Sequence, residues 1–221
     1  SKATGNQLAK IAAKAMIGIP LSEQDETFSH TPGFYSVKGP VFPFNKFPDT
    51  DPILGPEMKS TGEVMGTGMS FGEAYIKSQY AAGTEIPLSG NVFISVREPD
   101  KTKQLIKIAK QLLKKDYNLI ATQGTCDFLL NNNVKCTFIN KVREGKPHIV
   151  DMIKNKEINL IINTTEGKQS IQESFSIRAE AVIKNVTYYT SLEAAIATID
   201  SFDYFNNIDI NKIQNYKYNK N

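Results

Sequence analysis

Residues 90–125 read GNVFISVREPDKTKQLIKIAKQLLKKDYNLIATQGT, and this stretch decides the fold class. The apolar run at 92–96 predicts a strand, and the helical spacing of leucine, isoleucine and alanine over 105–113 predicts an amphipathic helix. A second apolar run at 119–122 predicts another strand. Strands that alternate with helices indicate a parallel sheet, and the crossovers that join such strands are right-handed.

The same alternation continues downstream. Helices are expected near 127–131, 149–154 and 171–182 and again from 192, and strands at 136–140, 158–162 and 186–190. The strand at 158–162 is apolar enough to be buried on both faces. We therefore predict an α/β domain over residues 89–200 with a five-stranded parallel sheet.

Residues 1–88 follow a different pattern. Apolar residues spaced from Leu8 to Met16 predict a helix, short strands are expected at 34–38 and 41–44, and a helix at 70–80. Proline and glycine punctuate the rest, as in loops and turns. We predict an α+β segment that is too small to complete a core of its own. The C-terminal tail at 201–221 shows no clear period after Phe202, and from there it is expected to be loosely attached or partly disordered.

Composition excludes several classes. The 221 residues are 40% hydrophobic and 22% charged, as in ordinary globular proteins rather than disordered or coiled-coil chains. The net charge of +3, from 26 basic and 23 acidic side chains, does not indicate a nucleic-acid partner. No apolar run approaches the roughly 20 residues of a membrane-spanning helix, so no membrane partner is expected.

Cysteine and histidine are scarce. Cys126 and Cys136 form no CxxC pair, and His30 and His148 are the two histidines, so a disulfide framework or structural zinc site is not expected. The start at Ser1 has neither an initiator methionine nor the apolar core of a signal peptide, and it resembles the interior of a longer chain. We expect a reduced, cytoplasmic protein.

Polar residues follow the predicted strands. The stretches 95–101, 122–125, 140–146, 163–168 and 190–191 carry hydroxyl groups, glycines, lysines and arginines. Ligands bind beyond the carboxyl ends of the strands in an open parallel sheet, and helix N-termini at this edge favour anions. The pattern indicates a phosphate or carboxylate site. The alternative is that the hydroxyl residues serve only as helix N-caps.

Catalytic machinery is harder to find. General acid–base catalysis needs a tuned histidine or a carboxylate pair in the pocket. His148 is interpreted as a helix-start residue, and Glu98, Glu144 and Glu166 lie on separate loops. The sequence contains no Ser-His-Asp order, P-loop or HExxH motif. We expect this domain to bind an anion without transforming it.

Two groups of motifs resemble a known family. SVK at 36–38, PFNKFP at 43–48 and GPEMKSTGEVMG at 55–66 resemble the large subunit of carbamoyl phosphate synthase. SVRE at 95–98, ATQGT at 121–125, NKV at 140–142 and IINTT at 161–165 resemble the C-terminal regulatory domain of that family, which has the methylglyoxal-synthase-like fold. The resemblance implies that residues 1–88 close the second ATP-grasp half and that residues 89–200 form the allosteric domain.

The resemblance also implies an activity. Two ATP-grasp halves of the family make carbamoyl phosphate, for pyrimidine and arginine biosynthesis, from bicarbonate, ammonia and two ATP. A glutaminase small subunit supplies the ammonia, and the heterodimers can associate further. ATP and Mg²⁺ or Mn²⁺ are thus expected cofactors of the full-length enzyme. The metal ligands of the second half lie upstream of Ser1, so the present piece is expected to hold no cofactor and to be inactive alone.

Two effector sites are implied by the same resemblance. The regulatory domain binds UMP or IMP, and the matching contacts are Ser95, Lys101, Thr122, Gly124, Thr125, Lys141, Asn163 and Thr165. Tyr188 and Thr190 match residues that help to bind ornithine. The family has a glutamate directly after Ser-Val-Lys, where this chain has Gly39, so we expect a weak ornithine response unless Asp25 or Glu26 substitutes.

Two alternatives come from other classes. Methylglyoxal synthase shares the fold and resembles the chain at 122–125, but it carries a catalytic Gly-Gly-Asp stretch after the third strand. The corresponding stretch here, 144–148, contains no aspartate, so lyase activity is not expected. The other alternative is a stand-alone phosphate- or anion-binding interaction module.

Overall fold

The computed structural model describes residues 1, 3–24, 32–47, 50–205, 208–212 and 215. Its central feature is a parallel sheet in the strand order β5-β4-β3-β6-β7. The strands are β3 (Gly90–Ser95), β4 (Tyr117–Ala121), β5 (Thr137–Phe138), β6 (Leu160–Asn163) and β7 (Thr187–Tyr189). The predicted five-stranded parallel sheet of an α/β domain is therefore confirmed.

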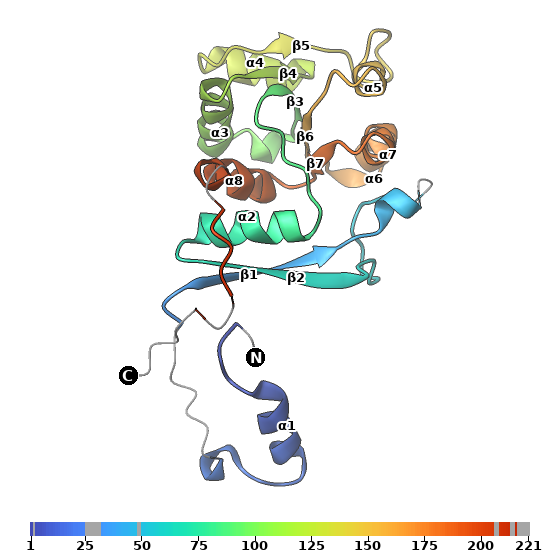
Figure 1. Cartoon of the computed structure of the whole chain (residues 1–221). Helices are drawn as coiled ribbons and strands as arrows, with labels where there is room; N and C mark the ends of the chain where they lie inside the picture. The colour runs from blue at the N-terminus through green and yellow to red at the C-terminus, as the bar shows by residue number, and fades with distance from the viewer. Residues whose placement is uncertain (2, 25–31, 48–49, 206–207, 213–214, 216–221) are drawn as a thin grey trace.

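Helices cover both faces of this sheet (Figure 1). They are α3 (Lys103–Lys114), α4 (Gln123–Asn131), α5 (Ile149–Lys154), α6 (Gly167–Glu173), α7 (Phe175–Ile183) and α8 (Leu192–Asp200). Helices α3, α4 and α8 contribute to one apolar cluster, and α5 and α7 contribute to the other. Central strand β3 serves both clusters, since alternate side chains of a strand point to opposite faces. Val92 and Ile94 face α3 and α8, whereas Phe93 faces α5 and α7, and all three are fully buried.

Residues 1–88 contribute a smaller unit against α8. Its packed elements are an antiparallel pair of strands, β1 (Tyr35–Val41) and β2 (Gly62–Gly68), and helix α2 (Phe71–Ala81); helix α1 (Leu8–Met16) precedes them in the chain. In Figure 1, α2 lies between this pair of strands and α8. Ile76 of α2 is buried in the same cluster as the sheet residues, and the Tyr75 hydroxyl lies 3.1 Å from that of Thr198 on α8. Short 3₁₀ helices span Leu21–Glu23, Phe44–Lys46, Glu98–Asp100 and Phe202–Tyr204.

Some predicted elements were wrong. The strand expected at 41–44 does not form, because Val41 ends β1 and Phe44 begins a 3₁₀ helix directly after Pro43. The single helix expected at 171–182 is broken at Ser174, which ends α6 and precedes α7. Strand β2 was not foreseen. The domain boundaries at 88 and 200 stay predictions.

The prediction of a loosely attached tail was wrong for its first residues. Phe202 and Phe205 are buried in the core, where Phe202 stacks on Tyr117 with ring centroids 5.8 Å apart. The ring of Phe205 meets Tyr80 of α2 edge-on at 5.3 Å. The rest of the tail falls partly outside the described residues. None of the described helices has the length and apolarity needed to cross a membrane.

Candidate functional site

A cavity of about 640 Å³ opens at the carboxyl ends of the central strands. Strand register pairs Ser95 of β3 with Asn163 of β6, and Ile94 with Ala121 of β4, which places Thr122 beside Ser95. The chain leaves β3 toward β4 and β5 on one side and later returns to β6 and β7 on the other. Such a reversal of strand order separates the loops and creates a crevice at this edge.

Most of the nucleotide contacts implied by the resemblance meet in this cavity. Those that line it are Ser95, Lys101, Thr122, Gly124, Thr125, Lys141 and Asn163. Thr165 does not line it, and the preceding Thr164 does. The structure therefore brings residues from four separate loops to one place, as expected for the edge of a parallel sheet.

The hydroxyl groups at the edge are not simply helix caps. Thr122 occupies the N-cap position of α4, yet its side chain makes no capping hydrogen bond. Its hydroxyl instead lies 3.0 Å from the Ser95 hydroxyl, and the Val96 N–H donates to the Thr125 hydroxyl at 3.1 Å. These bonds fix the first turn of α4 against β3. The free N–H groups of that turn remain available to an anion.

Gly124 makes room for a cation beside that helix turn. A Cβ atom at this position would lie 3.3 Å from the Lys101 ammonium, closer than most side-chain neighbours approach. The ammonium itself pairs with Glu98 at 2.6 Å. The missing side chain thus lets Lys101 lie against the start of α4.

Lys141 differs from the other cations of the cavity. Arg97 pairs with Asp100 at 2.9 Å, Lys101 pairs with Glu98, and Arg143 pairs with Glu173 at 2.9 Å. Within the described part of the chain, the Lys141 ammonium makes no ion pair, although its backbone N–H donates to Glu144 at 2.8 Å. Lys141 is therefore the cavity cation that is ready to pair with an incoming anion.

Asn163 adds a polar group without a partner to the lining of the cavity. The residue is only 5% exposed and lines the cavity, and its side-chain Nδ2 has no hydrogen-bond partner among the described residues. A buried amide nitrogen without an acceptor costs free energy, and native proteins rarely leave one unpaired. An acceptor oxygen of a bound anion would satisfy it.

Hydrogen bonds between loops stiffen the rim of the cavity. The Arg97 N–H donates to the Thr164 hydroxyl at 3.1 Å, which ties the loop after β3 to the loop after β6. Burial alone would raise the pKa of Asp100, but hydrogen bonds from Arg97 and Thr164 hold that pKa below its usual value. Asp100 thus stays ionised as the counter-charge of Arg97.

Sequence reasoning missed one wall of the cavity. The end of α6 and the start of α7 contribute Ser170, Gln172, Glu173, Ser174, Ser176 and Ile177. Together with Val142 and Ile149, Ile177 adds apolar surface to a polar pocket. The one available signal was the run of serines, which interrupts the apolar stripe of the helix expected there.

His148 is structural, as the sequence indicated. It caps α5 in a reciprocal arrangement: its Nδ1 accepts from the Asp151 N–H at 3.4 Å, and the Asp151 carboxylate accepts from the His148 N–H at 3.1 Å. His148 does not line the cavity. In the described ranges, no group of three or more histidine, cysteine or acidic residues is arranged to hold a metal ion.

A second cavity of about 430 Å³ lies between the two units and includes the predicted ornithine residues. Tyr188 and Thr190 line it together with Phe42 and Phe44, which follow β1 and whose ring centroids lie 5.0 Å apart. Among the described residues that line it, Glu85 is the one with a charged side chain. Asp25 and Glu26, the acids considered as substitutes, lie outside the described residues.

The comparisons with known proteins agree with this architecture. Residues 104–190 match the family model of the MGS-like domain. Carbamoyl phosphate synthase large chains are similar at 51% identity over 204 residues in Xanthomonas campestris pv. campestris, covering 92% of this chain and 19% of that protein. The large chain from Haemophilus ducreyi is 51% identical over 215 residues, covering 97% of this chain and 20% of that protein. The large chain from Ralstonia nicotianae is 46% identical over 215 residues, with the same two coverages of 97% and 20%.

The chain thus spans about a fifth of the length of these curated relatives. Among solved structures, a crystal structure of methylglyoxal synthase from Elizabethkingia anophelis NUHP1 matches with 17% identity and a TM-score of 0.42. The match covers 52% of this chain and 79% of the methylglyoxal synthase chain. The fold assignment rests on the sheet and on the family model.

Proposed function

We propose that the chain is the regulatory portion of a carbamoyl phosphate synthase large subunit. The premise is that the chain carries an MGS-like domain and is 46–51% identical to the C-terminal part of carbamoyl phosphate synthase large chains. Its first cavity binds a nucleotide effector, UMP or IMP. The observation that carries this proposal is the unpaired Lys141 ammonium and the unpartnered Asn163 amide, which line one cavity beside the start of α4.

The cavity suits both parts of a nucleotide. Its volume of about 640 Å³ falls within the range of roughly 300–1,000 Å³ that is typical of small-molecule sites. Lys141, Asn163 and the first turn of α4 favour a phosphate group. Val142, Ile149 and Ile177 provide apolar surface for a base, and the serines of α6 and α7 provide hydrogen-bond partners for a ribose.

The parent protein is a further part of the proposal. Because the relatives are named carbamoyl phosphate synthase large chains, we expect a glutamine-dependent ligase. It would use ATP with Mg²⁺ or Mn²⁺ and would have a glutaminase small subunit as its partner. It would act in the cytoplasm, in pyrimidine and arginine biosynthesis. The proposal includes further association of these heterodimers into a larger oligomer.

Calorimetric titration of the chain with UMP, IMP and inorganic phosphate tests the nucleotide site. Saturable binding of a nucleotide, tighter than that of phosphate, is the expected result. If phosphate binds as tightly as either nucleotide, the chain is an anion-binding module instead. Absence of any binding at millimolar nucleotide would reject the proposed function.

The chain alone is expected to show no bicarbonate-dependent ATP turnover. It corresponds to about a fifth of the relatives' length, and the resemblance places the metal ligands of the second ATP-grasp half upstream of it. A coupled assay for ADP release checks this, with the complete heterodimer as the positive control. Turnover by the purified chain above the background rate would contradict the assignment of a regulatory role.

Ornithine is expected to have little effect on the parent enzyme. Its two ammonium groups need carboxylates nearby, because a dehydrated ammonium without a counter-charge is costly. Tyr188 and Thr190 offer hydroxyl groups, and Gly39 offers no side chain where the family has a glutamate. Among the described lining residues Glu85 is the one carboxylate, so it can pair with only one of the two ammonium groups. ATP-saturation kinetics of the heterodimer with and without ornithine decide the matter. A several-fold fall in the apparent KM for ATP would show that another acid replaces the missing one.

A further inference from the structure

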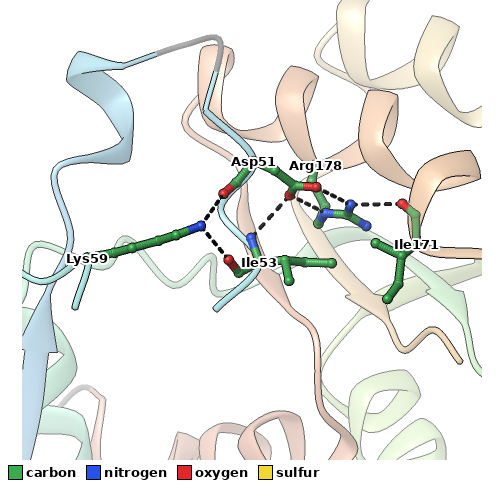
Figure 2. A network of polar contacts seen from close by, with 5 residues as sticks. All are labelled: Asp51, Ile53, Lys59, Ile171 and Arg178. Carbon is green, nitrogen blue, oxygen red and sulfur yellow. Dashed lines mark hydrogen bonds and ion pairs between the residues drawn. The ribbon is translucent and has the colours of Figure 1, made fainter. Parts of the chain in front are cut away.

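A fully buried guanidinium lies behind the missed wall of the first cavity. Arg178 of α7 is only 2% exposed. Figure 2 shows that it donates from Nε and Nη2 to the two carboxylate oxygens of Asp51, at 2.9 and 2.7 Å. Nη2 also donates to the Ile171 carbonyl of α6 at 2.9 Å. One side chain thus holds α6, α7 and a loop of the N-terminal unit together.

The loop that carries Asp51 is itself held in shape. The Lys59 ammonium donates to the backbone carbonyls of Asp51 and Ile53, at 3.1 and 2.7 Å, and the Ile53 N–H donates to the Asp51 carboxylate at 3.1 Å (Figure 2). Burial alone would raise the pKa of Asp51, but the hydrogen bonds from Arg178 and the Ile53 N–H hold that pKa below its usual value. The carboxylate is therefore ionised and held in place as the counter-charge of the guanidinium.

The position of Arg178 on α7 links it to both cavities. In the four residues before it, Ser174, Ser176 and Ile177 line the first cavity. One turn later, Ala181 and Val182 line the second cavity, together with Pro52 and Leu54 from the loop of Asp51. The ion pair consequently sits between the two cavities.

We propose that Arg178 and Asp51 form a positioning pair through which the loop at residues 51–59 sets the affinity of the first cavity for nucleotide. The inference rests on the proposed function. A buried guanidinium that loses its carboxylate must turn toward water, since an uncompensated buried charge is strongly destabilising. It would then release the Ile171 carbonyl and loosen the break between α6 and α7. Groups on β3, α4, β6 and the loop after β5, which face a phosphate, would keep their places.

Asp51→Asn tests this separation. Removing the charge should weaken UMP binding by about five- to tenfold, the scale of coupling carried by packed networks, and leave the affinity for inorganic phosphate unchanged. Amide hydrogen exchange of the unliganded protein should accelerate over residues 167–177 and not over α4. This second measurement needs no nucleotide, so it tests the positioning role even if wild-type protein fails to bind UMP, which would reject the proposed function alone.

Asp200→Asn is the matched control. Asp200 also accepts hydrogen bonds from a cation and from a neutral donor, Lys107 and Gln111, each at 2.9 Å, but it lines neither cavity. The Asp200→Asn variant should lose some stability, and both its UMP affinity and its amide hydrogen exchange at α6–α7 should be unchanged. If Asp51→Asn does not fold, the double variant Asp51→Asn with Arg178→Met removes both charges from the interior and should show the same selective loss. Equal UMP affinities in Asp51→Asn and Asp200→Asn, or parallel falls for UMP and phosphate, would overturn the proposal.

Discussion

Replacing Lys141 by alanine is expected to weaken UMP or IMP binding by about 1.5–3 kcal/mol, the worth of a charge-assisted hydrogen bond to phosphate. That corresponds to a roughly 10- to 150-fold rise in Kd. The effect should be large because the other cations of the cavity already pair with Asp100, Glu98 and Glu173. An incoming phosphate therefore meets one cation that loses no existing ion pair.

Two further variants isolate the charge of Lys141 in the same titration. Lys146→Ala removes an exposed cation from the same loop that does not line the cavity, and it should leave Kd within experimental error. Lys141→Arg keeps the charge and should retain most of the affinity. An unchanged Kd in Lys141→Ala would mean that the phosphate is not held where the structure leaves this ammonium unpaired.

Gly66→Ala is expected to lower the free energy of unfolding by about 3 kcal/mol or more, the upper range for overpacking in a closed interior. Strand β2 lies directly against α2 at this point. An added Cβ would fall 2.0 Å from the Ala74 carbonyl oxygen and 2.4 Å from the Ser78 nitrogen. Both are backbone atoms of a helix and cannot turn aside, so α2 as a whole would have to shift.

Gly62→Ala provides the comparison on the same strand. Nothing lies within 4 Å of the Cβ that it adds, and it restricts the unfolded chain, so it should be neutral or stabilising by up to about 1 kcal/mol. Urea unfolding of both variants with a common m-value measures the difference. Equal unfolding midpoints for the two variants would show that β2 and α2 are not in close backbone contact at Gly66 in solution.

The sheet could be predicted because burial on both faces leaves a direct mark on the sequence. The run at 158–162 is almost wholly apolar, and the stripe of α3 repeats with helical spacing. Strand β2 lacked such a mark. Its sequence, GEVMGTG, contains three glycines, and Gly66 is required by contact with α2 rather than by strand propensity. A close approach of this kind between two elements cannot be inferred from local pattern.

The residues of the candidate site could be predicted where the order of strands along the chain brings them together. They could not be predicted where the packing of side chains determines which residue faces the cavity. Loops after parallel strands must meet at one edge, so Ser95, Thr122, Lys141 and Asn163 were brought together as expected. Consecutive residues of extended chain point to opposite sides, and motif matching alone could not tell that Thr164, not Thr165, faces the cavity. Whether these residues bind nucleotide remains a prediction.

The α6–α7 wall shows the other limit. Its serines read as interruptions of a single amphipathic helix, because nothing local reveals that the chain bends at Ser174 to face a pocket. The bend is held by Arg178 through Asp51, a residue 127 positions away in the chain. Long-range polar contacts of this kind leave no periodic signal in either partner.

The glutamates around the first cavity limit how much negative charge an occupant can carry. Glu98, Glu144, Glu166 and Glu173 all line it, against Arg97, Lys101, Lys141 and Arg143. A single phosphate group can pair with Lys141, but a longer polyphosphate tail would place its added charges beside carboxylates, where like charges repel. We therefore expect this balance of side chains to disfavour triphosphates such as ATP relative to monophosphates. In the regulatory role proposed above, this charge balance would keep the cavity open to a monophosphate effector while ATP is abundant.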